Sequence, residues 1–153
     1  MIGMAITVEY TSIKLLDKLY EIEKQCFEEE AFTKHQLAYL LTDYITIGLV
    51  ARVNGEIAGF AIARVDIRRN MSFGHIITVN IAPVYRRKGI AQRLLNEVET
   101  IFRKEGIKDC HLEVREDNVA ALNLYQKLGY KKVGNLEKYY GEAHGLYLQK
   151  SLN

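Results

Sequence analysis

The sequence has no tryptophan, one proline and only two cysteines among its 153 residues. Two cysteines cannot build a disulfide scaffold, and Cys26 and Cys110 fit no metal-ligand spacing, so we expect two reduced and mostly buried thiols. The four histidines are scattered along the chain, and we therefore expect no zinc site and no other bound metal. These positions are His35, His75, His111 and His144.

Long apolar runs and an excess of one charge are also missing. No stretch approaches ~18 uninterrupted apolar residues, and the N-terminus lacks a basic flank followed by an apolar run. We therefore expect no membrane span and no secretion signal, and a cytoplasmic location. The net charge is only +2 because 19 carboxylates are interspersed with the cations, which argues against direct nucleic-acid binding.

The apolar residues, 48% of the composition, are enough to build the core of one domain over residues 1–153. Periodicity predicts the order strand, two helices, three antiparallel strands, helix, strand, helix and two strands. Thr11 or Ser12 is expected to cap the first helix and Thr33 the second, and Asn54-Gly55 predicts a tight hairpin. The expected strands cover residues 5–10, 45–53, 56–66, 73–81, 108–114, 130–135 and 145–150.

Three consecutive cations and a glycine, Arg86 to Gly89, lie where a strand gives way to an amphipathic helix. Backbone N–H groups without intrahelical partners and the helix dipole both favour an anion at such a place. Gly89 and Ala91 allow a ligand to approach the backbone closely. The residues alone therefore predict either a pyrophosphate site or a solvated basic helix start.

Residues 86–91, Arg-Arg-Lys-Gly-Ile-Ala, resemble the acetyl-CoA signature Arg/Gln-x-x-Gly-x-Gly/Ala of the GNAT superfamily of N-acetyltransferases. Residues 112–130 resemble the Leu-Glu-Val-Arg block of the RimI branch, and residues 138–140 resemble the Tyr-Tyr loop of RimI and of the NatA catalytic subunit. Both of those proteins acetylate protein N-termini. The resemblance implies a mixed α/β domain with a mostly antiparallel sheet, two splayed parallel strands, and helices on both faces.

The resemblance also implies the catalytic and cofactor-binding residues. Glu113 would be the general base, acting through water, and Tyr125 the acid that protonates the CoA sulfur. Without the resemblance, the residues alone leave other interpretations. Glu113 faces either a cleft or solvent, Tyr125 can be a core residue, and Asn118 is a helix cap. The cosubstrate would be acetyl-CoA, bound by Val79, Asn80, Ile81, Arg86, Arg87, Lys88, Gly89, Ile90, Ala91, Asn118 and Tyr125.

Residues 27–33 and the tyrosine pair, Tyr139 and Tyr140, are expected to form the walls of the site that binds the acceptor amine. Phe27, Tyr139 and Tyr140 would cover a peptide, and Glu29 in the acidic run would bind its cationic N-terminus, although such a run is also typical of a solvated helix end. The chain departs from its relatives here, since RimI has Pro-Trp-Ser in place of Ala-Phe-Thr at residues 31–33.

The expected acceptor is a peptide α-amine, such as that of a ribosomal protein or a nascent chain. Neutralising the amine at pH 7 costs about 1.4 kcal/mol for an N-terminus and about 4.6 kcal/mol for lysine. The alternatives are a lysine or small-amine acetyltransferase of the same fold, and a CoA-sensing or peptide-binding module without turnover. The oligomeric state stays open.

Overall fold

The computed structural model describes residues 4–27 and 30–153. Seven strands form one sheet in the order β1-β2-β3-β4-β5-β7-β6. The strands are β1 (Ile6–Tyr10), β2 (Thr46–Val53), β3 (Glu56–Arg68), β4 (Met71–Ile81), β5 (Asp109–Arg115), β6 (Lys131–Tyr140) and β7 (Ala143–Ser151). The α-helices are α1 (Leu16–Cys26), α2 (Lys34–Thr42), α3 (Ile90–Lys104) and α4 (Val119–Lys127). The mixed α/β fold predicted from the sequence is confirmed.

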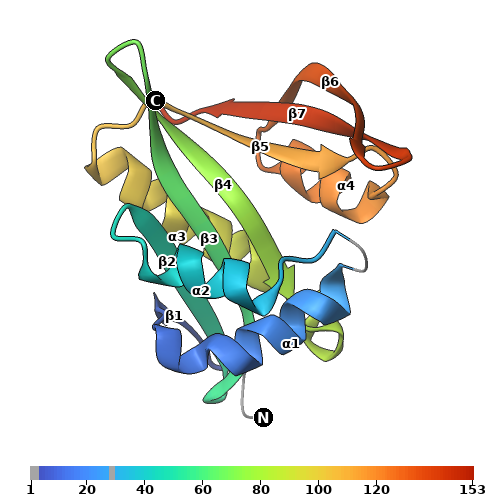
Figure 1. Cartoon of the computed structure of the whole chain (residues 1–153). Coiled ribbons are helices and arrows are strands. Elements are labelled where there is room, and N and C mark those ends of the chain that lie inside the picture. The colour runs from blue at the N-terminus through green and yellow to red at the C-terminus, as the bar shows by residue number, and fades with distance from the viewer. Residues whose placement is uncertain (1–3, 28–29) are drawn as a thin grey trace.

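The sheet opens in its middle, where its one parallel pair lies. β4 and β5 pair only through Gly74 with Cys110 and His75 with His111, and every other neighbouring pair is antiparallel. Beyond these two pairs β4 and β5 diverge, and the sheet splits into a β1–β4 half and a β5–β7 half (Figure 1). The predicted splay of the two parallel strands is therefore confirmed.

Helices cover both faces of the first half-sheet, as expected. The apolar stripe of α3, including Leu94, Val98 and Phe102, packs on one face, and α1 and α2 pack on the other through Leu19, Ile22 and Leu37. In β2 and β3, alternate residues serve the two faces because neighbouring strand side chains point in opposite directions. Within the described chain no helix is long and apolar enough to cross a membrane.

Short sequence motifs correctly predicted where several helices begin or end. Thr33 caps α2 in a full capping box with Gln36, since each side chain bonds the other's backbone N–H. Gly106, in the left-handed region at φ +77°, follows the end of α3. The expected cap of α1 is wrong, because a 3₁₀ turn (Ile13–Leu15) comes first and Ser12 makes no side-chain cap bond to it.

Two hairpins are tighter than the sequence predicts. β3 and β4 are joined by Arg69 and Asn70 alone, and both residues adopt positive φ, at 51° and 64°. β6 runs to Tyr140 rather than to residue 135, because a register shift after Leu136 lets pairing with β7 resume at Tyr140. The tyrosine pair thus ends a strand instead of lying in a long loop.

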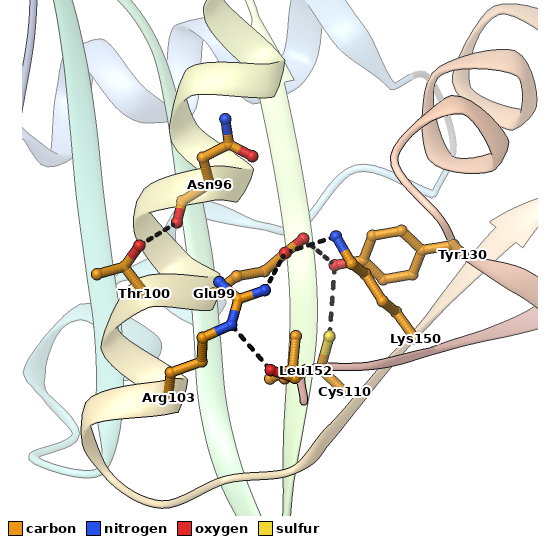
Figure 2. A network of polar contacts seen from close by, with 8 residues as sticks. All are labelled: Asn96, Glu99, Thr100, Arg103, Cys110, Tyr130, Lys150 and Leu152. Carbon is orange, nitrogen blue, oxygen red and sulfur yellow. Dashed lines mark hydrogen bonds and ion pairs between the residues drawn. The ribbon is translucent and has the colours of Figure 1, made fainter.

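A buried polar network fastens the second half-sheet to α3 (Figure 2). Glu99 on α3 is only 2% exposed, and its two oxygens bind Lys150 Nζ of β7 at 2.7 Å and Tyr130 Oη at 2.9 Å. Arg103 donates to the Leu152 carbonyl at 2.9 Å. β4 and β5 pair at only two residue positions. The contacts of the Glu99 network therefore fix the position of the β5–β7 half-sheet relative to the β1–β4 half-sheet.

Candidate active site

The splay of β4 and β5 opens a cleft of about 770 Å³. α1 and the segment after it form one wall, and α4 and the end of β6 form the other. The cleft brings together residues that are more than a hundred positions apart in the chain. Seven of the residues predicted from the sequence line it: Phe27, Val79, Glu113, Asn118, Tyr125, Tyr139 and Tyr140.

Glu113 faces the cleft, which decides between the two orientations that strand alternation left open. Its Oε2 lies 2.8 Å from His75 Nε2 on β4, and both side chains are largely buried. Burial by itself would raise the pKa of Glu113, but the hydrogen bond and positive charge of His75, with a further contribution from His111, outweigh it and lower the pKa. Glu113 is therefore an ionised carboxylate at neutral pH.

Tyr125 projects from α4 into the same cleft and meets Tyr130 edge to face, with ring centroids 5.7 Å apart. Burial raises the pKa of Tyr125 to about 12, so the phenol keeps its proton at neutral pH. Tyr125 also touches the apolar core that α4 covers, so part of the core interpretation holds. The cleft thus contains an ionised proton acceptor, Glu113, and a protonated donor, Tyr125.

Asn118 performs the role of helix cap that its residue type predicts. Its Oδ1 accepts the backbone N–H of Ala121 at 3.1 Å, at the start of α4. Its side chain also borders the cleft. The oxygen is occupied by the helix, so the amide nitrogen is the group that is left to meet a ligand.

The basic loop before α3 has the shape of an anion cradle. Gly89 is the N-cap of α3 at φ +79°, and no side chain caps the first turn, so its backbone N–H groups are open to an anion. Arg87 and Lys88 are exposed beside it. Arg86 instead donates to the Ile81 carbonyl at 3.1 Å and to Cys26 Sγ at 3.5 Å.

Two other predicted cofactor residues turn their side chains away from a ligand. Ile90 is 1% exposed in the core, and the Asn80 amide is 1% exposed and bound to Glu23 and Thr78. Both can offer only backbone groups. β4 has such groups to offer on the edge that faces β5, because beyond His75 that edge has no strand partner in the part of the chain that the structure describes, whereas the opposite edge pairs with β3.

An ion pair crosses the acceptor side of the cleft. Arg115 on β5 donates to Glu30 Oε1 at 2.8 Å and holds Asp117 through two further bonds at 2.9 Å. Tyr139 and Tyr140 lie edge to face nearby, and burial raises the pKa of both phenols. The predicted acceptor residue Glu29 lies outside the described residues.

The histidines are not all scattered in space, which corrects the expectation from the sequence. His75 and His111 stack with ring centroids 4.5 Å apart, and Asp66 lies beside them, so that one ligand atom from each could hold a metal ion. The stacked rings are tilted by only 22°, and Glu113 occupies His75 Nε2. Near-parallel rings do not direct their nitrogens at one point, which is unfavourable for a shared ion.

The sequence alone pointed to no role for three residues of the site: Glu23 and Arg115, which line the cleft, and His75, which bonds Glu113. A signal existed for His75, since it is a polar residue at an alternating position of a strand predicted to border the cleft. The contact of Arg115 with Glu30 gave no local signal, because the two residues are 85 positions apart in the chain.

Comparisons with known proteins agree with this geometry. The model of the acetyltransferase (GNAT) family matches residues 16–130. An N-alpha-acetyltransferase of Sulfurisphaera tokodaii is 32% identical over 117 residues, which cover 71% of this chain and 70% of that protein.

Two solved structures share the fold. The ribosomal-protein-S18-alanine N-acetyltransferase of Escherichia coli has a TM-score of 0.86 and 22% identity, with 97% of this chain and 95% of that chain covered. The NatC complex bound to Gag peptide and CoA has a TM-score of 0.88 and 23% identity, with 98% and 100% covered. The chain belongs to the acetyltransferase (GNAT) family.

Proposed function

We propose that this protein transfers the acetyl group of acetyl-CoA to the α-amine of a protein N-terminus, in the manner of RimI. The observation that carries the proposal is a single cleft that holds an ionised Glu113 and a protonated Tyr125. The relative from Sulfurisphaera tokodaii is named an N-alpha-acetyltransferase, and the NatC structure binds both CoA and a peptide, which supports a peptide acceptor.

The residues of the cradle fit a CoA molecule. The open N–H groups at the start of α3, with Arg87 and Lys88, would hold its pyrophosphate, and Gly89 leaves the backbone accessible because no atom lies within 4 Å of where a Cβ would be. The unpaired edge of β4 at residues 79–81 would pair with the pantetheine amides as an added strand does. Asn118 would meet the same arm from α4.

Glu113 and Tyr125 carry the proton transfers that the reaction needs. Glu113 accepts a proton from the acceptor ammonium through water, which frees the nitrogen lone pair. The nitrogen then forms a bond to the thioester carbonyl carbon and the carbon–sulfur bond breaks. Tyr125 donates its proton to the departing thiolate, and the nitrogen, which still carries one proton more than an amide, gives that proton back to the Tyr125 phenolate, so that the amide, the CoA thiol and the phenol all end neutral. His75 keeps the Glu113 carboxylate oriented through the bond of 2.8 Å.

The basicity of the acceptor favours an N-terminal amine over lysine. The cost of neutralising the amine at pH 7 is lower by about 3.2 kcal/mol for the N-terminus, from the reference pKa values. A ribosomal protein or nascent chain in the cytoplasm is the acceptor that we propose, by analogy with the Escherichia coli structure. The second candidate is a lysine or small-amine acetyltransferase of the same fold.

Labelled acetyl-CoA and a panel of N-terminal peptides test the proposal. N-blocked lysine peptides and polyamines serve as competing acceptors, and Glu113→Gln is the matched variant of low activity. We expect label in the free N-terminal peptides, with and without a metal chelator. Acetylation confined to the lysine peptides or polyamines would overturn the assignment to N-termini, and CoA binding without any acetylation would leave a binding module.

A further inference from the structure

The floor of the acceptor side contains a buried carboxyl that the proposed chemistry does not use. Glu23 lies near the end of α1, is 1% exposed and lines the cleft. Its Oε2 accepts the backbone N–H of Phe32 at 3.1 Å, and its Oε1 accepts the Asn80 amide at 3.1 Å. One side chain therefore joins α1, the acceptor wall and β4.

One of the two residues that bond Glu23 lies in the acceptor wall, and the other lies on the strand that would bind the cosubstrate. Phe32 lies in the wall that follows α1, and its side chain borders the cleft. Asn80 lies on β4 between the two residues whose backbone would hold the pantetheine arm, and it also donates to Thr78 Oγ1 at 3.0 Å. The position of the acceptor wall thus depends on the strand that binds the cosubstrate.

Glu23 has no cation to balance its charge. Among the described residues it forms no salt bridge, and Arg86, which follows β4, bonds instead to the Ile81 carbonyl and to Cys26 Sγ. Burial raises the pKa of Glu23 to about 7, against the opposing hydrogen bonds from Phe32 and Asn80. A buried carboxyl in this state is costly for the fold, so a structural role alone is a poor explanation for it.

We propose that Glu23 is a positioning residue that sets the acceptor wall against β4 and thereby determines how well the peptide binds. The inference rests on the proposed function. A carboxyl group suits the task because both partners present N–H donors and each of its two oxygens accepts one of them. Without these bonds the acceptor wall around Phe32 is no longer held in a fixed position against β4. The anion cradle at the start of α3, which Glu23 does not touch, is preserved.

The choice of variants follows from hydrogen-bond capacity. Glutamine can keep both contacts: its side-chain oxygen accepts the Phe32 N–H, and its NH2 group donates to Asn80 Oδ1 if the Asn80 amide flips. Asn80 Oδ1 is available because it is buried and has no other partner in the described structure. Methionine fills the same space and makes neither contact. Aspartate is one methylene shorter and cannot reach both partners, so it replaces methionine should that variant fail to fold. Glu21→Gln, at an exposed position of the same helix, controls for the loss of charge.

Steady-state kinetics with an N-terminal peptide and amide hydrogen exchange test the inference together. In Glu23→Met we expect the peptide KM to rise about tenfold or more, from the loss of two bonds to a charged group. The KM for acetyl-CoA should stay within about twofold, and residues 30–33 should exchange faster. Glu23→Gln should restore most of the peptide affinity and the protection.

The outcomes separate this inference from the function on which it rests. A peptide KM within about twofold of the parent in Glu23→Met, or unchanged exchange at residues 30–33, would overturn the positioning role. An equal rise in both KM values would also overturn it, because it would indicate general damage to the fold. If the parent acetylates no peptide at all, the proposed function fails, and hydrogen exchange still decides whether Glu23 holds the wall.

Discussion

Removing the cation from the buried Glu99 network should destabilise the protein far more than the loss of a surface ion pair. The change is Lys150→Met, which keeps an unbranched apolar side chain as far as Cε, with sulfur in place of Cδ, and removes the ammonium. Glu99 is 2% exposed and its Oε1 lies 2.7 Å from Lys150 Nζ (Figure 2). The variant leaves a carboxylate in the interior between α3 and β7 without its closest positive partner.

The structure sets the size of the effect. Breaking a buried ion pair by removing one partner costs about 3–5 kcal/mol. The lower end applies here, because Arg103 stays 3.5 Å from the same oxygen and Tyr130 still donates to the other oxygen at 2.9 Å. A loss of about 3 kcal/mol corresponds to a fall in Tm of about 6–12 °C for a chain of this size.

Urea denaturation of the parent, Lys150→Met and the double variant Glu99→Met/Lys150→Met gives the free energies of unfolding. The double variant should be more stable than the single one, because replacing both charges by apolar groups removes the unpaired carboxylate. A single-variant loss below about 1 kcal/mol would refute the reasoning, since it is the value of a solvated pair. A double variant no more stable than Lys150→Met would refute it as well.

Three further predictions concern the cleft and its surroundings. Glu113→Gln and Tyr125→Phe should each lower kcat about 10²-fold or more with little change in CoA affinity, and Glu113→Gln should partly recover at high pH, where the amine is already neutral. Rates within twofold of the parent across that range would make Glu113 a structural residue. Gly89→Val should raise the acetyl-CoA KM, because φ is +79° there and a branched side chain would fill the space over the helix N-terminus; unchanged CoA affinity by calorimetry would place the phosphate site elsewhere. Burial raises the pKa of Glu23 to about 7, so this group's contribution to the free energy of unfolding falls as the pH rises from about 4.5 to 7. Glu23→Gln should remove that decrease, and an identical pH dependence in the parent and the variant, measured by urea unfolding, would contradict the burial argument.

The sequence by itself determined the features that depend on neighbours within a few positions. The apolar stripe of α3, the cap of α2 by Thr33, and the glycine that follows α3 were all predicted, because helix periodicity and caps are set by residues three to four positions apart. The cap of Asn118 on α4 was predicted for the same reason. The cradle before α3 belongs to this group, since its cations and glycine are consecutive.

Only the tertiary structure decided which distant side chains meet in the cleft. His75 and Glu113 are 38 positions apart, Asn80 and Glu23 are 57 apart, and Arg115 and Glu30 are 85 apart. Strand alternation limits each of these residues to one of two faces, but it does not give the register of the strands or the point where β4 and β5 diverge. The relative position of the two half-sheets depends on α3, which packs on the first half-sheet and is bonded to the second through the Glu99 network. The sum of many long-range contacts sets this geometry, and no short stretch of the sequence encodes it.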